Sequence, residues 1–128
     1  MVFIMEGKMK PKRWFREDIT FTFASGASGA DLVQSENLDK YEGEILHIHQ
    51  RNSDNAGNRT AQLTIEDMDG YEIWDGTAKN DNANYDHEFV SARRVLSGRE
   101  TLKCTISGDP GAGGYTVVAV IWLYGRDG

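Results

Sequence analysis

The stretch 100–124 constrains the fold of this chain more than any other part of it. Residues 101–107 alternate between apolar and polar side chains, which is the period of a half-buried β-strand. A glycine-rich segment at 108–114 then interrupts the pattern. Residues 115–124 are β-branched, aliphatic or aromatic on both faces, which is too apolar for an ordinary surface strand. We therefore predict a long antiparallel hairpin whose second strand is covered on both sides.

The same alternation predicts more strands along the chain. The strand pattern begins at Trp14 and recurs at 44–50, 60–66, 71–74 and 85–90. No stretch shows a sustained 3.6-residue period, and residues 31–41 fit either a short strand or a helical turn. The predicted fold class is all-β: an antiparallel β-sandwich, jelly-roll-like, with an extended N-terminal arm. The strand order stays open.

Length and charge predict one domain with a basic arm. The chain has 128 residues and a net charge of −6. We predict that it consists of an arm at 1–12 and one sandwich domain at 13–125. Residues 1–16 hold five basic side chains against Glu6, a net of +4, so the remainder carries −10. Phosphate binding needs clustered Lys and Arg, so an acidic body argues against a nucleic-acid partner. We find neither an apolar run of about 18 residues nor a signal-peptide core, and we expect a soluble protein made in a cytoplasm-like compartment.

The second expected strand carries the most suggestive chemistry. Leu46 and Ile48 are predicted to share one of its faces, with Ile45, His47 and His49 on the other. Two histidines at i and i+2 on a strand are how some β-barrels present metal ligands.

A metal centre, however, needs a third and usually a fourth protein ligand. The cupin signature adds a carboxylate four or five residues on and a distant third histidine. Asp54 stands only at the edge of that spacing, and His87 has no matching context. We predict that His47 and His49 bind no metal and that the protein has no cofactor.

Acidic and amide side chains gather in two further places. Asp67 and Asp69, and the segment 80–84 with Asp86, offer loop oxygens for calcium. Neither has the ordered spacing of an EF-hand loop, and both residue types are common in turns, so calcium binding stays open. Asp69 with the glycine that follows it predicts a two-residue hairpin turn.

Features of catalysis are missing from the sequence. It contains no Gly-x-Ser-x-Gly elbow and no phosphate-binding Gly-x-x-x-x-Gly-Lys. Cys104 stands on the apolar side of its predicted strand, where no intrachain disulfide is possible and a small buried hydrophobe is expected. We predict that the protein is not an enzyme.

The aromatic residues suggest a binding surface. They are Trp14, Trp74, Trp122, Tyr71, Tyr85 and Tyr124. Such residues either form a carbohydrate-stacking platform or fill cores and interfaces. One face of the last strand is predicted to fill the sandwich; it carries Tyr115, Val117, Ala119, Ile121 and Leu123. The opposite face is also apolar and needs a cover. A partner subunit is the natural candidate for that cover. The predicted interface comprises that face and the arm: Val118, Val120, Trp122, Tyr124, Phe3, Ile4, Lys8, Lys10, Lys12 and Arg13.

Two segments carry a resemblance to a known group of proteins. They are Thr64-Ile-Glu-Asp-Met-Asp-Gly-Tyr-Glu-Ile-Trp74 and Leu96-Ser-Gly-Arg-Glu-Thr-Leu-Lys-Cys-Thr-Ile-Ser-Gly-Asp-Pro-Gly-Ala-Gly-Gly-Tyr-Thr-Val117. Over about residues 61–123 the pattern resembles small jelly-roll virion proteins of tailed bacteriophages. The resemblance implies a virion structural protein that decorates the capsid shell as an oligomer, with no catalytic residues.

The leading hypothesis is therefore a capsid decoration or stabilising protein. Its expected partners are the major capsid protein and sister subunits, with no nucleic acid and no membrane. It would be made in the host cytoplasm and reside in the virion. A carbohydrate-binding β-sandwich module, free or on a phage tail, is the alternative. A metal-dependent β-barrel enzyme, which rests on His47 and His49 alone, is the third hypothesis.

Overall fold

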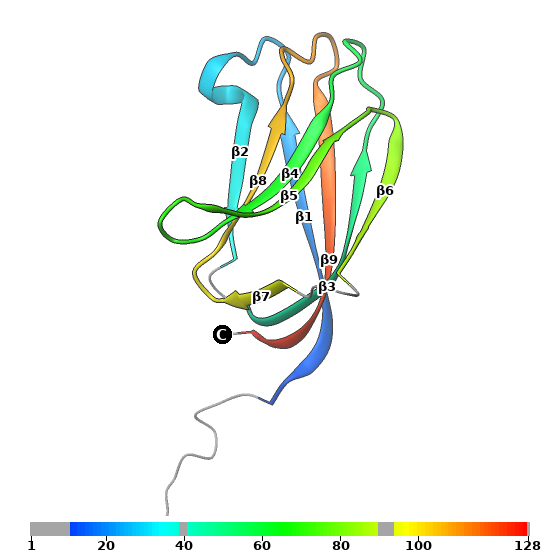
Figure 1. The fold of residues 1–128 in the computed structure, drawn as a ribbon. Helices are drawn as coiled ribbons and strands as arrows, with labels where there is room; N and C mark the ends of the chain where they lie inside the picture. The colour runs from blue at the N-terminus through cyan, green and yellow to red at the C-terminus, as the bar shows by residue number, and fades with distance from the viewer. Residues whose placement is uncertain (1–10, 39–40, 90–93, 128) are drawn as a thin grey trace, which may run out of the picture.

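A computed structural model describes residues 11–38, 41–89 and 94–127 (Figure 1). Within these residues the chain forms strands and one short 3-10 turn, and no α-helix. The elements are β1 (Arg13–Phe23), η1 (Gly29–Leu32), β2 (Val33–Asn37), β3 (Tyr41–Asn52), β4 (Ala61–Glu66), β5 (Glu72–Lys79), β6 (Ala83–Glu88), β7 (Arg94–Ser97), β8 (Thr101–Ile106) and β9 (Tyr115–Asp127).

The strands form two antiparallel sheets that face each other. One sheet has the order β1-β9-β3-β6, with the short β7 also paired to β3, and the other has the order β2-β8-β4-β5. If β7 is set aside, this is the strand order of a jelly roll, in which two Greek keys fold over one core. The predicted antiparallel β-sandwich is confirmed, and the strand order that the sequence left open is that of a jelly roll.

The predicted hairpin of the last two strands is wrong. β8 pairs with β2 and β4, whereas β9 pairs with β1 and β3, so the two lie in different sheets. Packed sheets stand about 10 Å apart, a distance that the glycine-rich segment 108–114 spans easily. Gly111, Gly113 and Gly114 adopt positive φ there, which lets the chain change direction between the layers.

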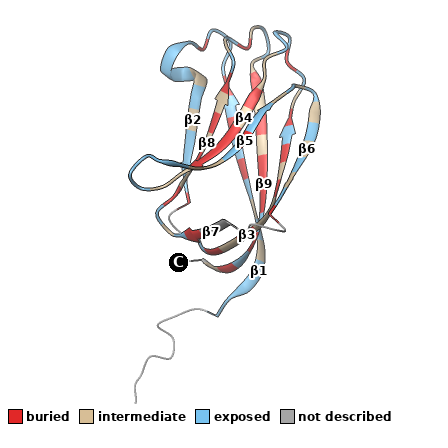
Figure 2. Cartoon of the chain, viewed as in Figure 1, coloured by how far each residue is buried: buried red, intermediate tan, exposed pale blue. Residues whose placement is uncertain are grey.

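β9 lies at the centre of its sheet and divides into two unlike faces. Tyr115, Val117, Ala119, Ile121 and Leu123 are all buried between the sheets, as the alternation predicts. Figure 2 shows buried residues along this strand and along β4 and β8 of the opposite sheet. The other face of β9 points away from the core and is partly exposed.

A β-bulge in β3 overturns the predicted division of its faces. The pairing of β3 with β9 shifts between Ile45 and His47, so Leu46 is an extra residue in the ladder. Ile45 and Ile48 are therefore both fully buried, although the alternation placed them on opposite faces. The bulge leaves His47 and His49 on the outer face of the sheet.

Other boundaries differ more modestly. β5 runs five residues beyond the predicted 71–74, to Lys79, and β6 begins at Ala83 inside the predicted polar loop. Residues 31–41 contain the end of η1, then β2 and the start of β3. The turn between β4 and β5 is a three-residue loop, because Asp67 N–H donates to the Tyr71 carbonyl at 2.9 Å. Val90, predicted as the end of a strand, lies outside the described residues.

Candidate functional site

Neighbouring strands bring outward side chains together on the β1-β9-β3-β6 sheet. Arg16 lies opposite Trp122, which lies opposite His47 on the far side of β9. In the next row, Asp18, Val120, His49 and Asp86 follow one another across the four strands. We call this surface the outer sheet face; it consists of Arg16, Asp18, His47, His49, Arg51, Asp86, Val120 and Trp122.

A shallow hollow of about 210 Å³ lies on this face. Val120 and Trp122 contribute its apolar lining, and the other lining residues are Arg16, His47, His49 and Arg51. Val120 is almost covered, with 5% of its surface exposed, whereas Trp122 keeps 41% exposed. The hollow thus combines apolar surface from β9 with cationic and imidazole groups from the two flanking strands.

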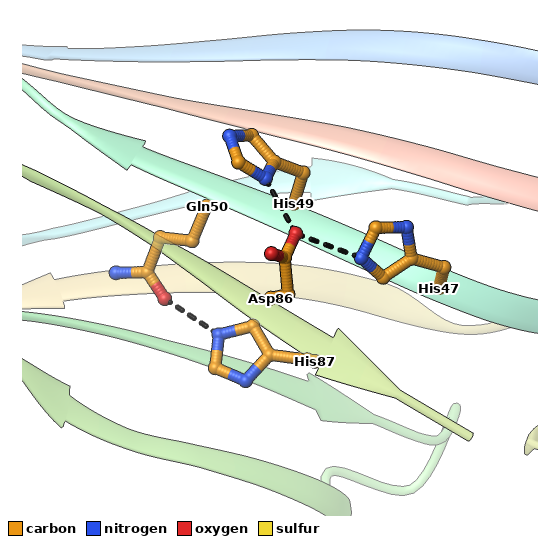
Figure 3. A network of polar contacts seen from close by, with 5 residues as sticks. All are labelled: His47, His49, Gln50, Asp86 and His87. Atoms are coloured by element: carbon orange, nitrogen blue, oxygen red, sulfur yellow. Dashed lines mark hydrogen bonds and ion pairs between the residues drawn. The ribbon is translucent and has the colours of Figure 1, made fainter. Parts of the chain in front are cut away.

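Asp86 joins the two histidines of β3 (Figure 3). Its Oδ1 atom lies 2.9 Å from Nε2 of His47 and 2.7 Å from Nδ1 of His49. When Asp86 is ionised it only accepts hydrogen bonds, so each imidazole donates an N–H to it. These bonds, that of His49 first and that of His47 second, hold the pKa of Asp86 below its ordinary value.

His87 belongs to a different environment, although it neighbours Asp86 in sequence. Its Nε2 atom donates to Oε1 of the buried Gln50 at 3.0 Å (Figure 3). Its ring also makes a T-shaped contact with Trp74, with the two centroids 5.2 Å apart. Burial, helped by the charge of Lys79, lowers the pKa of His87 below 6.5.

The three histidines consequently do not form one ligand set. His47 and His49 converge on a single carboxylate oxygen, while His87 turns to the other side of the sheet. No group of three His, Cys, Asp or Glu in the described part of the chain is placed to hold a metal ion. The sequence did not reveal Asp86 as the partner of these histidines, because the pairing of β3 with β6 follows only from the strand order.

Arg16 and Asp18 are paired beside Trp122. The guanidinium Nε and Nη2 atoms of Arg16 lie 2.8 and 2.9 Å from the two carboxylate oxygens of Asp18. The same guanidinium carbon lies 5.4 Å from the centroid of the Trp122 ring. A bidentate ion pair orients the guanidinium plane, so Arg16 is held over one face of the indole.

The exposed aromatic residues continue toward the start of β1. Trp14 packs against Tyr124 with ring centroids 5.2 Å apart, and these residues are 67% and 37% exposed. Together with Trp122 they form a strip on two adjacent strands, which we call the aromatic strip. Sequence reasoning gave Trp122 and Tyr124 as interface residues but had not joined Trp14 to them, since the β1–β9 pairing was unknown.

The remaining predicted interface residues are placed as follows. Val118 is half-buried, and Lys12 and Arg13 are exposed where β1 begins. The guanidinium of Arg13 lies 4.8 Å from the ring centroid of Phe15. Phe3, Ile4, Lys8 and Lys10 lie outside the described residues.

Two of the acidic loop residues that the sequence offered for calcium accept backbone hydrogen bonds. The Asp67 carboxylate accepts the backbone N–H groups of Asp69 and Tyr71 at 3.0 and 2.9 Å. The Asp81 carboxylate accepts the N–H of Asn55 at 2.8 Å and thereby joins two loops. The bonds of Asp67 are typical of the role of Asp in turns.

Cys104 is fully buried between the sheets, as expected for a small hydrophobe. Burial raises the pKa of its thiol to about 12, so the thiolate needed for nucleophilic chemistry is suppressed. Among the described residues, no helix is long and apolar enough to cross a membrane.

Comparisons with known proteins add little to this surface. No family model matches the chain, and no curated protein matches it. Two structures of infectious bursal disease virus align with 94% of the chain: that of the Gx strain at 10% identity and a TM-score of 0.33, and that of the Gt strain at 11% and 0.32. The alignment spans 39% of the viral chain in each case. At these values neither alignment assigns the chain to a family or a function.

Proposed function

We propose that this chain is a non-enzymatic structural protein of a virus particle, which decorates and stabilises a capsid shell as an oligomer. Its partners would be the major capsid protein and sister subunits. The jelly-roll strand order suits this role, although lectins and cupins share the same architecture. Architecture alone therefore does not select a function, and the choice rests on the surface.

The aromatic strip is the observation that carries the proposal. Trp14, Trp122 and Tyr124 are exposed on two adjacent strands whose pairing is continuous from Arg13 to Phe23. Aromatic residues and arginine are enriched at protein interfaces, where their large surfaces are removed from water. The polar pairs around the strip, Arg16 with Asp18 and His49 with Asp86, supply a polar rim.

The outer sheet face is less suited to catalysis. A cupin-like metal centre would lie within the fold, whereas His47 and His49 lie on its outer surface and are hydrogen-bonded to Asp86. The hollow is lined by Arg, His, Val and Trp side chains and offers no Ser, Thr, Cys or Lys nucleophile.

Replacement of Trp122 tests the proposal. If Trp122 anchors an interface between copies, Trp122→Ala should weaken self-association by more than about 2 kcal/mol, or about 30-fold in dissociation constant. Light scattering during size exclusion, over a range of protein concentrations, measures this. Tyr71→Ala is the matched control, because Tyr71 is 71% exposed but lies on the loop between β4 and β5. Wild-type protein that stays monomeric and does not sediment with capsids would overturn the assembly role.

Carbohydrate binding is the second candidate, because the hollow presents Trp122 beside hydrogen-bonding groups. A sugar ring stacks on an aromatic face, but one face of Trp122 is already covered by Arg16. This arrangement favours the assembly role. Saccharide recognition would replace the assembly role if the wild type is monomeric and binds a glycan array, and if Trp122→Ala loses this binding while Tyr71→Ala keeps it.

A further inference from the structure

The two long openings of the sandwich, where the edges of the facing sheets meet, are closed in different ways. At the opening between β5 and β6, Trp74 packs against His87 and against Phe89, with ring centroids 5.2 and 5.4 Å apart. Lys79 lies over the Tyr85 ring at 5.5 Å on the same side. Aromatic side chains therefore cover this opening.

The opening between β1 and β2 is hollow instead. One hollow of about 210 Å³ is lined by residues 17–21 of β1 and 34–37 of β2. A second, of about 380 Å³, continues past Gln34 toward residues 24–31. A hydrogen bond from the Gln34 side chain to the Thr22 carbonyl crosses between the strands where the hollows meet. We call the two hollows together the β1–β2 groove.

Backbone groups of β1 point into this groove. Among the described strands, β1 pairs only with β9, and its register with β9 is unbroken from Arg13 to Phe23. The Thr22 carbonyl faces the groove, since it accepts from Gln34. Backbone N–H and C=O groups of every second strand residue point to the same edge, so those of Asp18 and Thr20 do too. Such an edge is a template for an added strand.

The groove is acidic and its floor is apolar. Glu17 and Glu36 supply its acidic side chains, because the carboxylate of Asp18, which also lines the first hollow, is paired with Arg16. Lys and Arg are missing from the side chains that line this hollow. Ile19 and Phe21, which are buried, contribute its apolar part. An occupant should therefore be extended, basic on one face and apolar on the other.

The segment 1–12 of the same sequence has this pattern. Lys8, Lys10 and Lys12 recur at every second residue, so in an extended chain their side chains lie on one face. The other face would carry Phe3, Met5 and Met9, while Val2, Ile4 and Glu6 precede the lysines on the lysine face. Residues 1–10 lie outside the described residues, and the segment leads directly into β1.

The segment 1–12 of the same copy cannot easily enter this groove, because it leads directly into β1. To run antiparallel beside Glu17 and the residues after it, the chain would have to turn near Arg13. Because β1 begins at Arg13, that turn would fall at Pro11 and Lys12, and the ring of Pro11 fixes a negative φ that the favoured two-residue hairpin turns exclude. A hairpin turn at Gly7 and Lys8 would bring residues 1–6 back only to 9–14, short of Glu17.

We propose that the basic segment 1–12 of one copy docks as an added strand in the β1–β2 groove of a second copy. This deepens the proposed assembly role, because it names a second contact between copies that is separate from the aromatic strip. The Lys side chains would face the groove carboxylates, and the main chain would bind the free edge of β1.

Charge reversal in the full-length protein tests the proposal. One variant reverses the arm (Lys8→Glu, Lys10→Glu, Lys12→Glu), and the other reverses the groove (Glu17→Lys, Glu36→Lys). Each alone should lose arm-dependent association, because its arm and groove then carry like charges. An equimolar mixture should regain it, since each arm then finds a groove of opposite charge on the other variant. Glu72→Lys with Glu88→Lys, at exposed sites on β5 and β6, is the matched control and should associate like wild type.

Several results would overturn the proposal. Association that is indifferent to both reversals would show that arm and groove do not meet. A single chain can also carry both reversals. If arm-dependent association recovers in that chain but not in the mixture of the two variants, the arm occupies the groove of its own copy. If Trp122→Ala abolishes association but neither reversal affects it, the assembly role stands and only the groove contact fails.

A labelled synthetic peptide of residues 1–12 tests the groove even if the wild type is monomeric. Fluorescence anisotropy should show that the peptide binds the full chain. The groove reversal should weaken binding by about tenfold or more, and the β5–β6 control should not. Equal binding to wild type and to the groove reversal would overturn the proposal, whatever the result for the aromatic strip.

Discussion

His87 is distinguished from the other two histidines by its position beside Trp74 and its bond to Gln50. Since burial lowers its pKa below 6.5 in the folded state, the unfolded chain takes up a proton first as the pH falls. The stabilising contribution of neutral His87 is thus complete above pH 6.5. It is lost as the pH falls from there to the lower, folded pKa.

We therefore predict that His87→Gln makes stability less sensitive to pH. The free energy of unfolding of the wild type should fall below pH 6.5 with a slope of at most about 1.4 kcal/mol per pH unit from this group. In His87→Gln this part of the slope should disappear, because the amide does not titrate. Urea unfolding at several pH values between 5 and 8 measures both curves. Parallel curves would mean that His87 does not titrate differently on folding.

For His47 and His49 we predict that chelation has no effect. Both imidazoles donate to Asp86, so the pair is satisfied by hydrogen bonds and requires no metal. EDTA should leave the melting temperature of the wild type unchanged, and added Zn²⁺ should not raise it. His47→Ala with His49→Ala should retain stability and assembly. A metal site would be established if the melting temperature of the wild type falls with EDTA and recovers with Zn²⁺, while that of the double variant responds to neither.

At the scale of the strands, simple alternation predicted the correct inward faces of β4 and β8, whose pairing with each other is regular. Leu63 of β4 and Ile106 of β8 are both buried, as predicted. Leu63→Ala and Ile106→Ala should each lower the free energy of unfolding by about 2–5 kcal/mol, because each removes buried methyl groups and leaves a cavity. Chemical denaturation provides the measurement. Val33→Ala, at a partly exposed valine of β2, is the control and should cost far less. Equal losses in all three would contradict this view of the core.

The same alternation failed in β3, where one extra residue at Leu46 changes which side chains face inward. No turn residue or composition change marks the bulge in the sequence. Its consequence reaches the candidate site, because it keeps both histidines on the outer face while Ile45 and Ile48 remain in the core.

At the scale of the whole molecule, the sequence predicted the layers but not their connections. Local alternation encodes burial, so the sandwich and the two faces of β9 could be predicted. Which strands are neighbours depends on contacts between distant segments, and the segment 108–114 suited a sheet-to-sheet connection as well as a hairpin. Three features depend on that strand order: the link between Asp86 and the histidines, the addition of Trp14 to the aromatic strip, and the β1–β2 groove.

The two proposed contacts between copies should respond differently to salt. The arm and groove would attract each other through charges near the surface, whose reach falls from about 10 Å at 0.1 M salt to about 3 Å at 1 M. The aromatic strip would bind mainly by removing apolar surface from water, which salt does not screen.

Sedimentation velocity between about 0.1 and 1 M NaCl separates these contributions. In Trp122→Ala, the remaining association should depend on the arm and should be lost as salt rises. In the variant with Lys8, Lys10 and Lys12 reversed to Glu, the remaining association should depend on the aromatic strip and should persist at 1 M. The Glu72→Lys, Glu88→Lys control should follow the wild type. If both interface variants show the same salt dependence, the protein assembles through one contact, and the separation of arm from aromatic strip is wrong.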